Sequence, residues 1–191
     1  MKTHLRSVST VMLITLSWLS QASQCNEQEW NKALASQRVW DQTYNLLASK
    51  YNEWLPSFQQ SIFLHVEFSN NELSYLWSKD TNHFQDKVNK QILAISESRQ
   101  QLNSLIQYID RLPDEVLEQL QTWRDIEEAC GSDKLIANEV AAGHYIRSDQ
   151  QLIQDFTHLK KQLEIMRRSY DNEIFTLKNI SSQQALIPHQ E

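Results

Sequence analysis

Apolar residues recur at alternating intervals of three and four along most of the chain, and this spacing constrains the fold more than any other feature. It places apolar side chains on one stripe of an α-helix and is typical of helices that pack side by side. The chain has only two glycines and three prolines, so it offers few places to turn. The sequence therefore predicts an all-α protein, an elongated antiparallel helical bundle or set of coiled-coil hairpins with three to five helices.

The first helix is expected to begin near residue 26, and Pro56 interrupts its apolar stripe. Proline removes a helical hydrogen bond and clashes with the preceding turn, so we expect a kink or break there and a short irregular or helical piece over 57–68. We interpret the aromatic residues of this helix mainly as core. Because aromatic side chains also anchor interfaces, they are the candidate interface residues as well: Trp30, Trp40, Tyr44, Tyr51, Trp54 and Phe58.

A second, longer helix is expected over 69–112. Ser69 and Glu72 fit the capping-box pattern at its start. The apolar stripe is interrupted at Ser98 and Arg99, because neither residue at this core-facing position is apolar. The predicted stripe consists of Trp77, Thr81, Phe84, Val88, Ile92, Ile95, Leu102, Leu105, Ile109 and Leu112.

Pro113 suits the first turn of a third helix, which we expect to end at a left-handed cap on Gly131. A weaker helical piece is predicted over 132–148, and a last helix from about 148 to 179. In the stripe of that helix Glu173 occupies one apolar slot. The other positions are Leu152, Phe156, Leu159, Leu163, Met166, Tyr170 and Leu177.

The N-terminal residues have the pattern of a secretory signal. Lys2 and Arg6 precede an apolar run over 11–19, and small residues at Ser20 and Ala22 predict cleavage after Ala22. The run is too short to span a bilayer, although an uncleaved anchor is an alternative. We therefore expect a signal peptide over 1–22, a single helical-bundle domain over 23–180 and a flexible tail over 181–191. The expected compartment is the periplasm, with the extracellular space as the alternative.

The net negative charge of the chain limits the classes of partner that it can be expected to bind. The full chain carries 18 basic and 24 acidic side chains, and removal of residues 1–22 would leave 16 basic ones and a net charge of −8. Such an excess of acid argues against nucleic acid and against anionic membrane surfaces, which both bind cationic side chains. No later apolar run is long enough to predict a transmembrane segment after signal cleavage.

The two cysteines, Cys25 and Cys130, predict one disulfide in an oxidising compartment. Lipidation of Cys25 is an alternative, but Gln24 is not the small residue that such signals place before the cysteine. If the first helix stops at Pro56, the second overhangs it by about 20 Å and the third returns to the level of Cys25. In this interpretation the disulfide and the break at Pro56 support each other.

Motifs for chemistry are absent from the sequence. It contains no glycine-rich phosphate loop, no nucleophile elbow and no His-x-x-x-His pair. Asp155 and His158 lie one helical turn apart, but a metal site needs three or four convergent ligands. We therefore expect no enzyme activity, no metal and no cofactor.

The sequence favours an exported interaction or scaffold protein of the cell envelope. Its expected partner is another envelope protein, and a homo-oligomer is an alternative. A small-ligand sensor is a second hypothesis, because polar residues at the core-facing positions Gln37, Ser98 and Glu173 would suit a buried pocket. A holdase-like chaperone that uses apolar grooves is the third.

Overall fold

The computed structural model of the chain describes residues 24–79 and 83–184, so the predicted signal peptide lies outside the described residues. The described part is helical and contains no strand, which confirms the all-α prediction. None of its helices is long and apolar enough to cross a membrane. The helices are α1 (Glu27–Gln60), α2 (Leu64–Glu67), α3 (Asn70–Lys79), α4 (His83–Ile109), α5 (Leu112–Ser132) and α6 (Ile136–Gln184).

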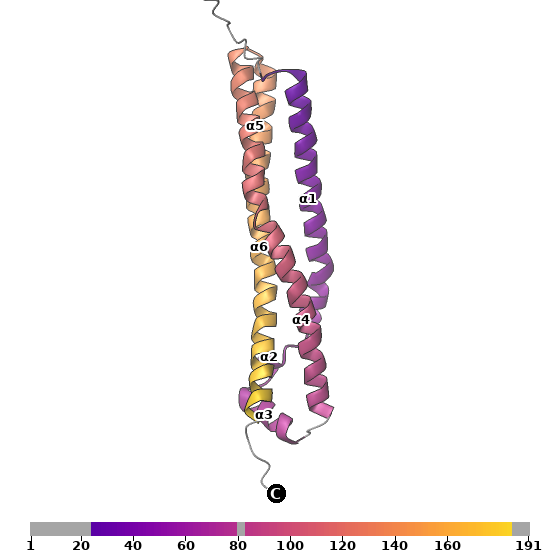
Figure 1. The fold of residues 1–191 in the computed structure, drawn as a ribbon. Coiled ribbons are helices and arrows are strands. Elements are labelled where there is room, and N and C mark those ends of the chain that lie inside the picture. Colours follow the sequence, from indigo (N-terminus) through magenta and orange to yellow (C-terminus); the bar gives the residue numbers. More distant parts are fainter. Residues whose placement is uncertain (1–23, 80–82, 185–191) are drawn as a thin grey trace, which may run out of the picture.

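The helices form a long rod that is built around α6 (Figure 1). α1 runs from the disulfide end toward the far end, α4 and α5 follow one another back, and α6 returns over the whole length. With 49 residues, α6 is about 74 Å long, and every other helix packs against it. α2 and α3 fold across the far end, beyond the end of α1.

α4 and α5 together form one bent support, that is, two consecutive helices that pack end to end along α6, and they do not form a hairpin. Only Asp110 and Arg111 separate them, and Ile109 and Leu112 on either side are both buried. Pro113 lies in the first turn of α5, where its missing N–H has no intrahelical partner to lose, so helix resumes without a reversal. The expectation that residues 113–130 double back is therefore wrong.

The break that was one of the two outcomes expected at Pro56 does not occur, and the disulfide forms without it. α1 continues to Gln60, and Pro56 lies about one turn before its end. The only backbone bond that Pro56 removes is the one to the carbonyl of Asn52, and Asn52 is exposed, so water can replace the missing donor. The N–H of Ser61 then closes the helix on the carbonyl of Phe58, at 3.1 Å.

The glycines do not mark the turns that the sequence suggested. α5 runs through Gly131 to Ser132, and the left-handed residue is Lys134, with φ 59°. α6 begins at Ile136 and runs through Gly143, so the separate piece over 132–148 and the helix start at 148 are both wrong. A Cβ on Gly143 would lie 2.7 Å from the Glu127 carboxylate, so a larger residue here would require the Glu127 side chain to move.

Two further boundaries differ from the expectation. The helix expected over 69–112 is described as α3 and α4, with residues 80–82 between them outside the description. The predicted capping box is confirmed: Ser69 N–H donates to Glu72 Oε2 at 2.8 Å, and Glu72 N–H donates to Ser69 Oγ at 3.3 Å. Residues 181–184 belong to α6 rather than to the predicted tail, whose remaining residues lie outside the description.

The core consists of three clusters along the rod. The disulfide-end cluster contains Ala33, Leu120, Trp123, Ile126, Cys130, Ala142 and Ile146. The far-end cluster contains Leu73, Trp77, Val88, Leu177 and Ile180. The central cluster is the largest, and it contains Leu47, Leu102, Ile106, Ile109, Leu112, Val116, Leu152, Phe156, Leu159, Leu163, Met166 and Tyr170. Most stripe positions of the second and last predicted helices are buried in these clusters.

The structure joins Cys25 to Cys130 as the sequence predicts, across a separation of 105 residues. Replacing both by serine should lower the free energy of unfolding by about 4 to 5 kcal/mol, because the cross-link restricts a loop of this length in the unfolded chain. Urea unfolding of the oxidised protein and of the Cys25→Ser/Cys130→Ser variant, followed by helical circular dichroism, measures the difference. Equal unfolding midpoints would contradict the cross-link.

Candidate functional site

A long groove opens between α1 and α4, whose backbones seldom approach each other closely although both helices pack on α6. We call it the central groove; its volume is about 940 Å³. The lining residues recur at helical spacing, so each helix turns one face toward it. They are Leu46, Leu47, Lys50, Glu53 and Trp54 of α1, and Glu97, Gln100, Gln101, Ser104, Leu105 and Tyr108 of α4.

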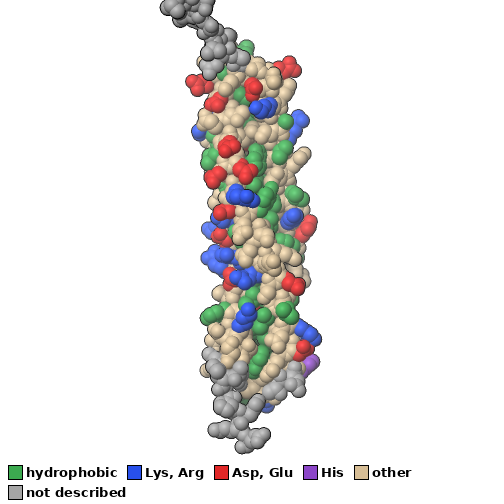
Figure 2. Space-filling view, in the orientation of Figure 1, with side chains coloured by type: hydrophobic (Ala, Val, Ile, Leu, Met, Phe, Trp, Pro, Cys, Tyr) green, Lys and Arg blue, Asp and Glu red, His purple; other side chains and the backbone are tan. Residues whose placement is uncertain are grey.

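The central groove has an apolar floor and mixed edges. Leu47 is only 2% exposed, whereas Leu46 and Tyr108 at the edges are 59% and 44% exposed. Lys50 is the one basic residue among those lining it, beside two acids. Figure 2 shows the same character over one face of the whole rod, where hydrophobic side chains run lengthwise between charged ones.

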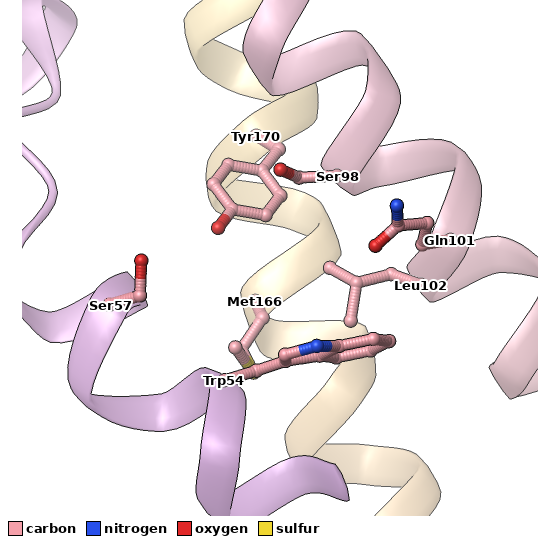
Figure 3. A pocket seen from close by; sticks show the side chains of 7 residues that line it. All are labelled: Trp54, Ser57, Ser98, Gln101, Leu102, Met166 and Tyr170. Carbon is pink, nitrogen blue, oxygen red and sulfur yellow. The ribbon is translucent and has the colours of Figure 1, made fainter.

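A smaller space, the central cavity, adjoins the central groove and has a volume of about 130 Å³. Trp54 and Gln101 line both spaces. The cavity lies where the sequence lacks an apolar residue at Ser98, so the weak point of the predicted stripe becomes a space between three helices. Its lining residues are Trp54, Ser57, Ser98, Gln101, Leu102, Met166 and Tyr170 (Figure 3).

The six aromatic residues of the candidate interface are all half-buried against the core. The Trp30 ring meets Trp123 at 5.3 Å between ring centres, Tyr44 meets Phe156 at 5.5 Å, and Phe58 meets Tyr170 at 5.7 Å. These contacts agree with the core interpretation. Of the six, only Trp54 lines the central groove, and the role of the set as a partner interface stays a prediction.

Glu173 fills its core-facing slot as a fully buried carboxylate that organises the far end. It accepts hydrogen bonds from the N–H groups of Leu64 and His65 at 2.8 and 2.9 Å, from His65 Nδ1 at 2.5 Å and from Gln91 Nε2 at 2.6 Å. A buried carboxylate is tolerated when several donors surround it. Glu173 therefore holds α2 to α4 and α6, and the sequence had marked it only as a polar residue in an apolar slot.

Gln37 and Asp149 form a second buried polar group near the disulfide end. Trp123 Nε1 donates to Gln37 Oε1 at 2.9 Å. Asp149 is fully buried, and neither its oxygens nor Gln37 Nε2 makes a well-formed hydrogen bond to the described residues. Burial raises the pKa of Asp149 to about 6, the nearby Gln37 amide opposes the rise, and the Asp41 carboxylate adds to it.

Sequence reasoning missed Asp149 because Ser148 looked like the start of a helix, which would make Asp149 an ordinary first-turn acid. In the structure the last helix begins twelve residues earlier. If the apolar stripe of this helix is extended toward its N-terminus, it passes through Ala142 and Ile146, which are both buried, and Asp149 then falls on the core-facing side. The sequence therefore indicates that Asp149 is buried, provided that the helix is assumed to continue through Gly143.

Within residues 24–79 and 83–184, no group of three or more His, Cys, Asp or Glu side chains is arranged to hold a metal ion. Comparison of the chain with protein-family models, with curated protein sequences and with solved structures finds no match. The central groove and central cavity are therefore interpreted from their own geometry.

The Asp149→Asn variant should be more stable than the original protein at pH 8 and gain little at pH 4. Because the folded-state pKa lies above the ordinary value of 3.8, the native state holds this proton more tightly than the unfolded chain. Stability should therefore fall as the pH rises from about 4 through 6, by at most about 3 kcal/mol. Urea unfolding at both pH values measures the gain.

Asp155→Asn is the matched control for this experiment. Asp155 lies on the same helix but is only half-buried, and it accepts a hydrogen bond from Gln151 at 2.9 Å. It should show no gain that grows between pH 4 and pH 8. An Asp149→Asn variant that is less stable than the original protein at pH 8 would show that the carboxylate has a favourable partner.

Proposed function

We propose that this protein is an exported interaction protein of the cell envelope that binds an amphipathic helix of a protein partner in the central groove. The observation that carries the proposal is the separation of α1 from α4 beside a buried apolar floor. Leu46 and Tyr108 leave exposed apolar surface on the two edges of the groove, and a docked partner would cover it.

A short helix matches the length of this groove. The lining face of α1, from Leu46 to Trp54, is about 12 Å long, and that of α4, from Glu97 to Tyr108, is about 17 Å long. A docked helix of two to three turns would match these lengths and pack against both faces, as in other helix-in-groove complexes. Its apolar residues would recur at intervals of three and four.

The charges at the groove favour a partner helix with a basic residue beside its apolar stripe. Glu53 and Glu97 line the groove from opposite helices, and Lys50, three residues before Glu53 on α1, is the one basic residue among the residues that line it. A lysine or arginine of the partner could pair with either acid. Pairs at an interface edge set orientation and partner choice more than affinity.

Export to the periplasm belongs to the same proposal. Its support is the signal-like pattern of residues 1–22 together with the Cys25–Cys130 disulfide, since disulfides persist in oxidising compartments. The lack of a catalytic motif in the sequence is compatible with a binding role.

A small-ligand-binding bundle is the second candidate function. The observation that favours it is the central cavity, which is enclosed by three helices and carries hydroxyl and amide groups among its lining residues. Ligand sites commonly combine an apolar enclosure with a few polar groups. The two candidate functions use adjoining spaces and do not exclude each other.

Photo-crosslinking tests the helix-docking proposal. A benzoylphenylalanine placed at Tyr108 should capture one envelope protein, and mass spectrometry should map the link to an amphipathic segment with apolar residues at intervals of three and four. Leu46→Glu should reduce the yield at least tenfold, because it places a charge on the opposite edge of the groove.

Val140→Glu is the matched control, since Val140 is 56% exposed and lies on α6 outside the residues that line the groove. It should leave the yield unchanged. Equal losses from both variants, or links to many unrelated unfolded proteins, would contradict the proposal; the second result would indicate a holdase.

A further inference from the structure

We propose that the central cavity binds one neutral aromatic ring that carries a hydroxyl group, that is, a phenol. This inference gives a ligand class to the second candidate function and does not depend on the docking of a helix. It rests on three features of the lining: its size, its apolar surfaces and its polar groups.

The size of the central cavity suits a single six-membered ring. Its volume is about 130 Å³. An engineered apolar cavity of about 150 Å³ in another protein is known to take up benzene. A single water molecule would leave most of this space empty.

The apolar part of the lining offers contacts for an aromatic ring. Figure 3 shows the Trp54 ring across one side of the cavity, with Leu102 and Met166 beside it. Aromatic rings pack favourably on tryptophan, and a thioether makes favourable contacts with ring edges. These three side chains come from three different helices, so a bound ring would join α1, α4 and α6.

The polar part of the lining calls for a hydroxyl group. The Tyr170 hydroxyl points toward the cavity in Figure 3, and the amide of Gln101, an exposed residue, also lines it. Ser98 Oγ donates to the Ala94 carbonyl at 3.2 Å and keeps its own capacity to accept. A phenol can donate to these groups and accept from them, whereas a hydrocarbon can do neither.

A charged ligand does not fit. None of the seven lining residues is a lysine, arginine, histidine, aspartate or glutamate. A carboxylate or ammonium group would lose its hydration without gaining a counter-charge. Benzoates and aromatic amines in their charged forms are therefore excluded.

The phenol could reach the cavity from two sources through the central groove, because Trp54 and Gln101 line both spaces. It could be a free small molecule or the tyrosine side chain of a segment that lies in the groove. The chemistry of recognition is the same in both cases, and the experiment separates them.

The methyl group of Met166 is a direct reporter, since no other methionine follows Met12 in the sequence. In the oxidised protein, p-cresol should shift the NMR signal of this methyl group through the ring current. It should bind at least tenfold more tightly than toluene, and 4-methylbenzoate should not shift the signal. No shift with p-cresol, or equal affinity for toluene, would overturn the proposal.

Ser98→Leu and Ser104→Leu form a matched pair of variants on α4. Ser98→Leu fills the cavity and restores the apolar stripe, so it should raise the melting temperature and abolish the response to p-cresol. Ser104 lines only the groove, so Ser104→Leu should leave the response unchanged. Undiminished binding to folded Ser98→Leu would place the ligand elsewhere and overturn the proposal.

A final pair of probes identifies the source. A model amphipathic helix with one central tyrosine is compared with its tyrosine-to-phenylalanine counterpart. If the tyrosine peptide binds at least tenfold more tightly than p-cresol and Leu46→Glu removes that advantage, the source is a docked segment. If it binds no more tightly than p-cresol, the source is a free phenol; stronger binding of the phenylalanine peptide would overturn the proposal.

Discussion

The burial of one continuous apolar stripe along α6 is the interaction on which the rest of the structure depends. α6 is the only described helix that runs the full length of the rod, and α1, α2, α3, α4 and α5 all pack against it. A helix in water gains most of its stability from such packing rather than from its own propensity. The combined length of α4 and α5 matches that of α6, and Lys160 of α6 contacts Asp110 at the bend between them.

α1 is held at its two ends by contacts other than core packing, and its middle part packs on the central cluster. The disulfide fixes its beginning to α5, and the segment that follows it is fixed to α6 through Glu173. Between these points its approach to α4 stays open, and the central groove and central cavity lie there. A bundle of this kind can combine a stable framework with a binding surface whose width is set by the position of one helix.

Much of the fold could be predicted from the sequence, because helical spacing directly reports which side chains face a core. The stripe of α6, the capping box at Ser69 and the pairing of the cysteines all follow from local pattern or simple counting. The weak point at Ser98 likewise predicted a departure from close packing. The path of the chain at the prolines could not be predicted. The sequence around Pro56 and Pro113 does not determine whether the helix continues, bends or reverses there. That outcome is decided by packing against α6, which lies far away in the sequence.

α4 and α5 form one bent support along α6 instead of a hairpin at Pro113, and the distance between a residue on α4 and a residue on α5 distinguishes the two arrangements. Spin labels at the exposed positions Lys87 and Glu128, attached without cysteine chemistry so that the disulfide stays intact, allow this distance to be measured by pulsed electron paramagnetic resonance. The two positions are 41 residues apart, so a continuous support predicts a separation of about 60 Å. A hairpin at Pro113 would bring the labels to within about 20 Å of each other and would contradict the account.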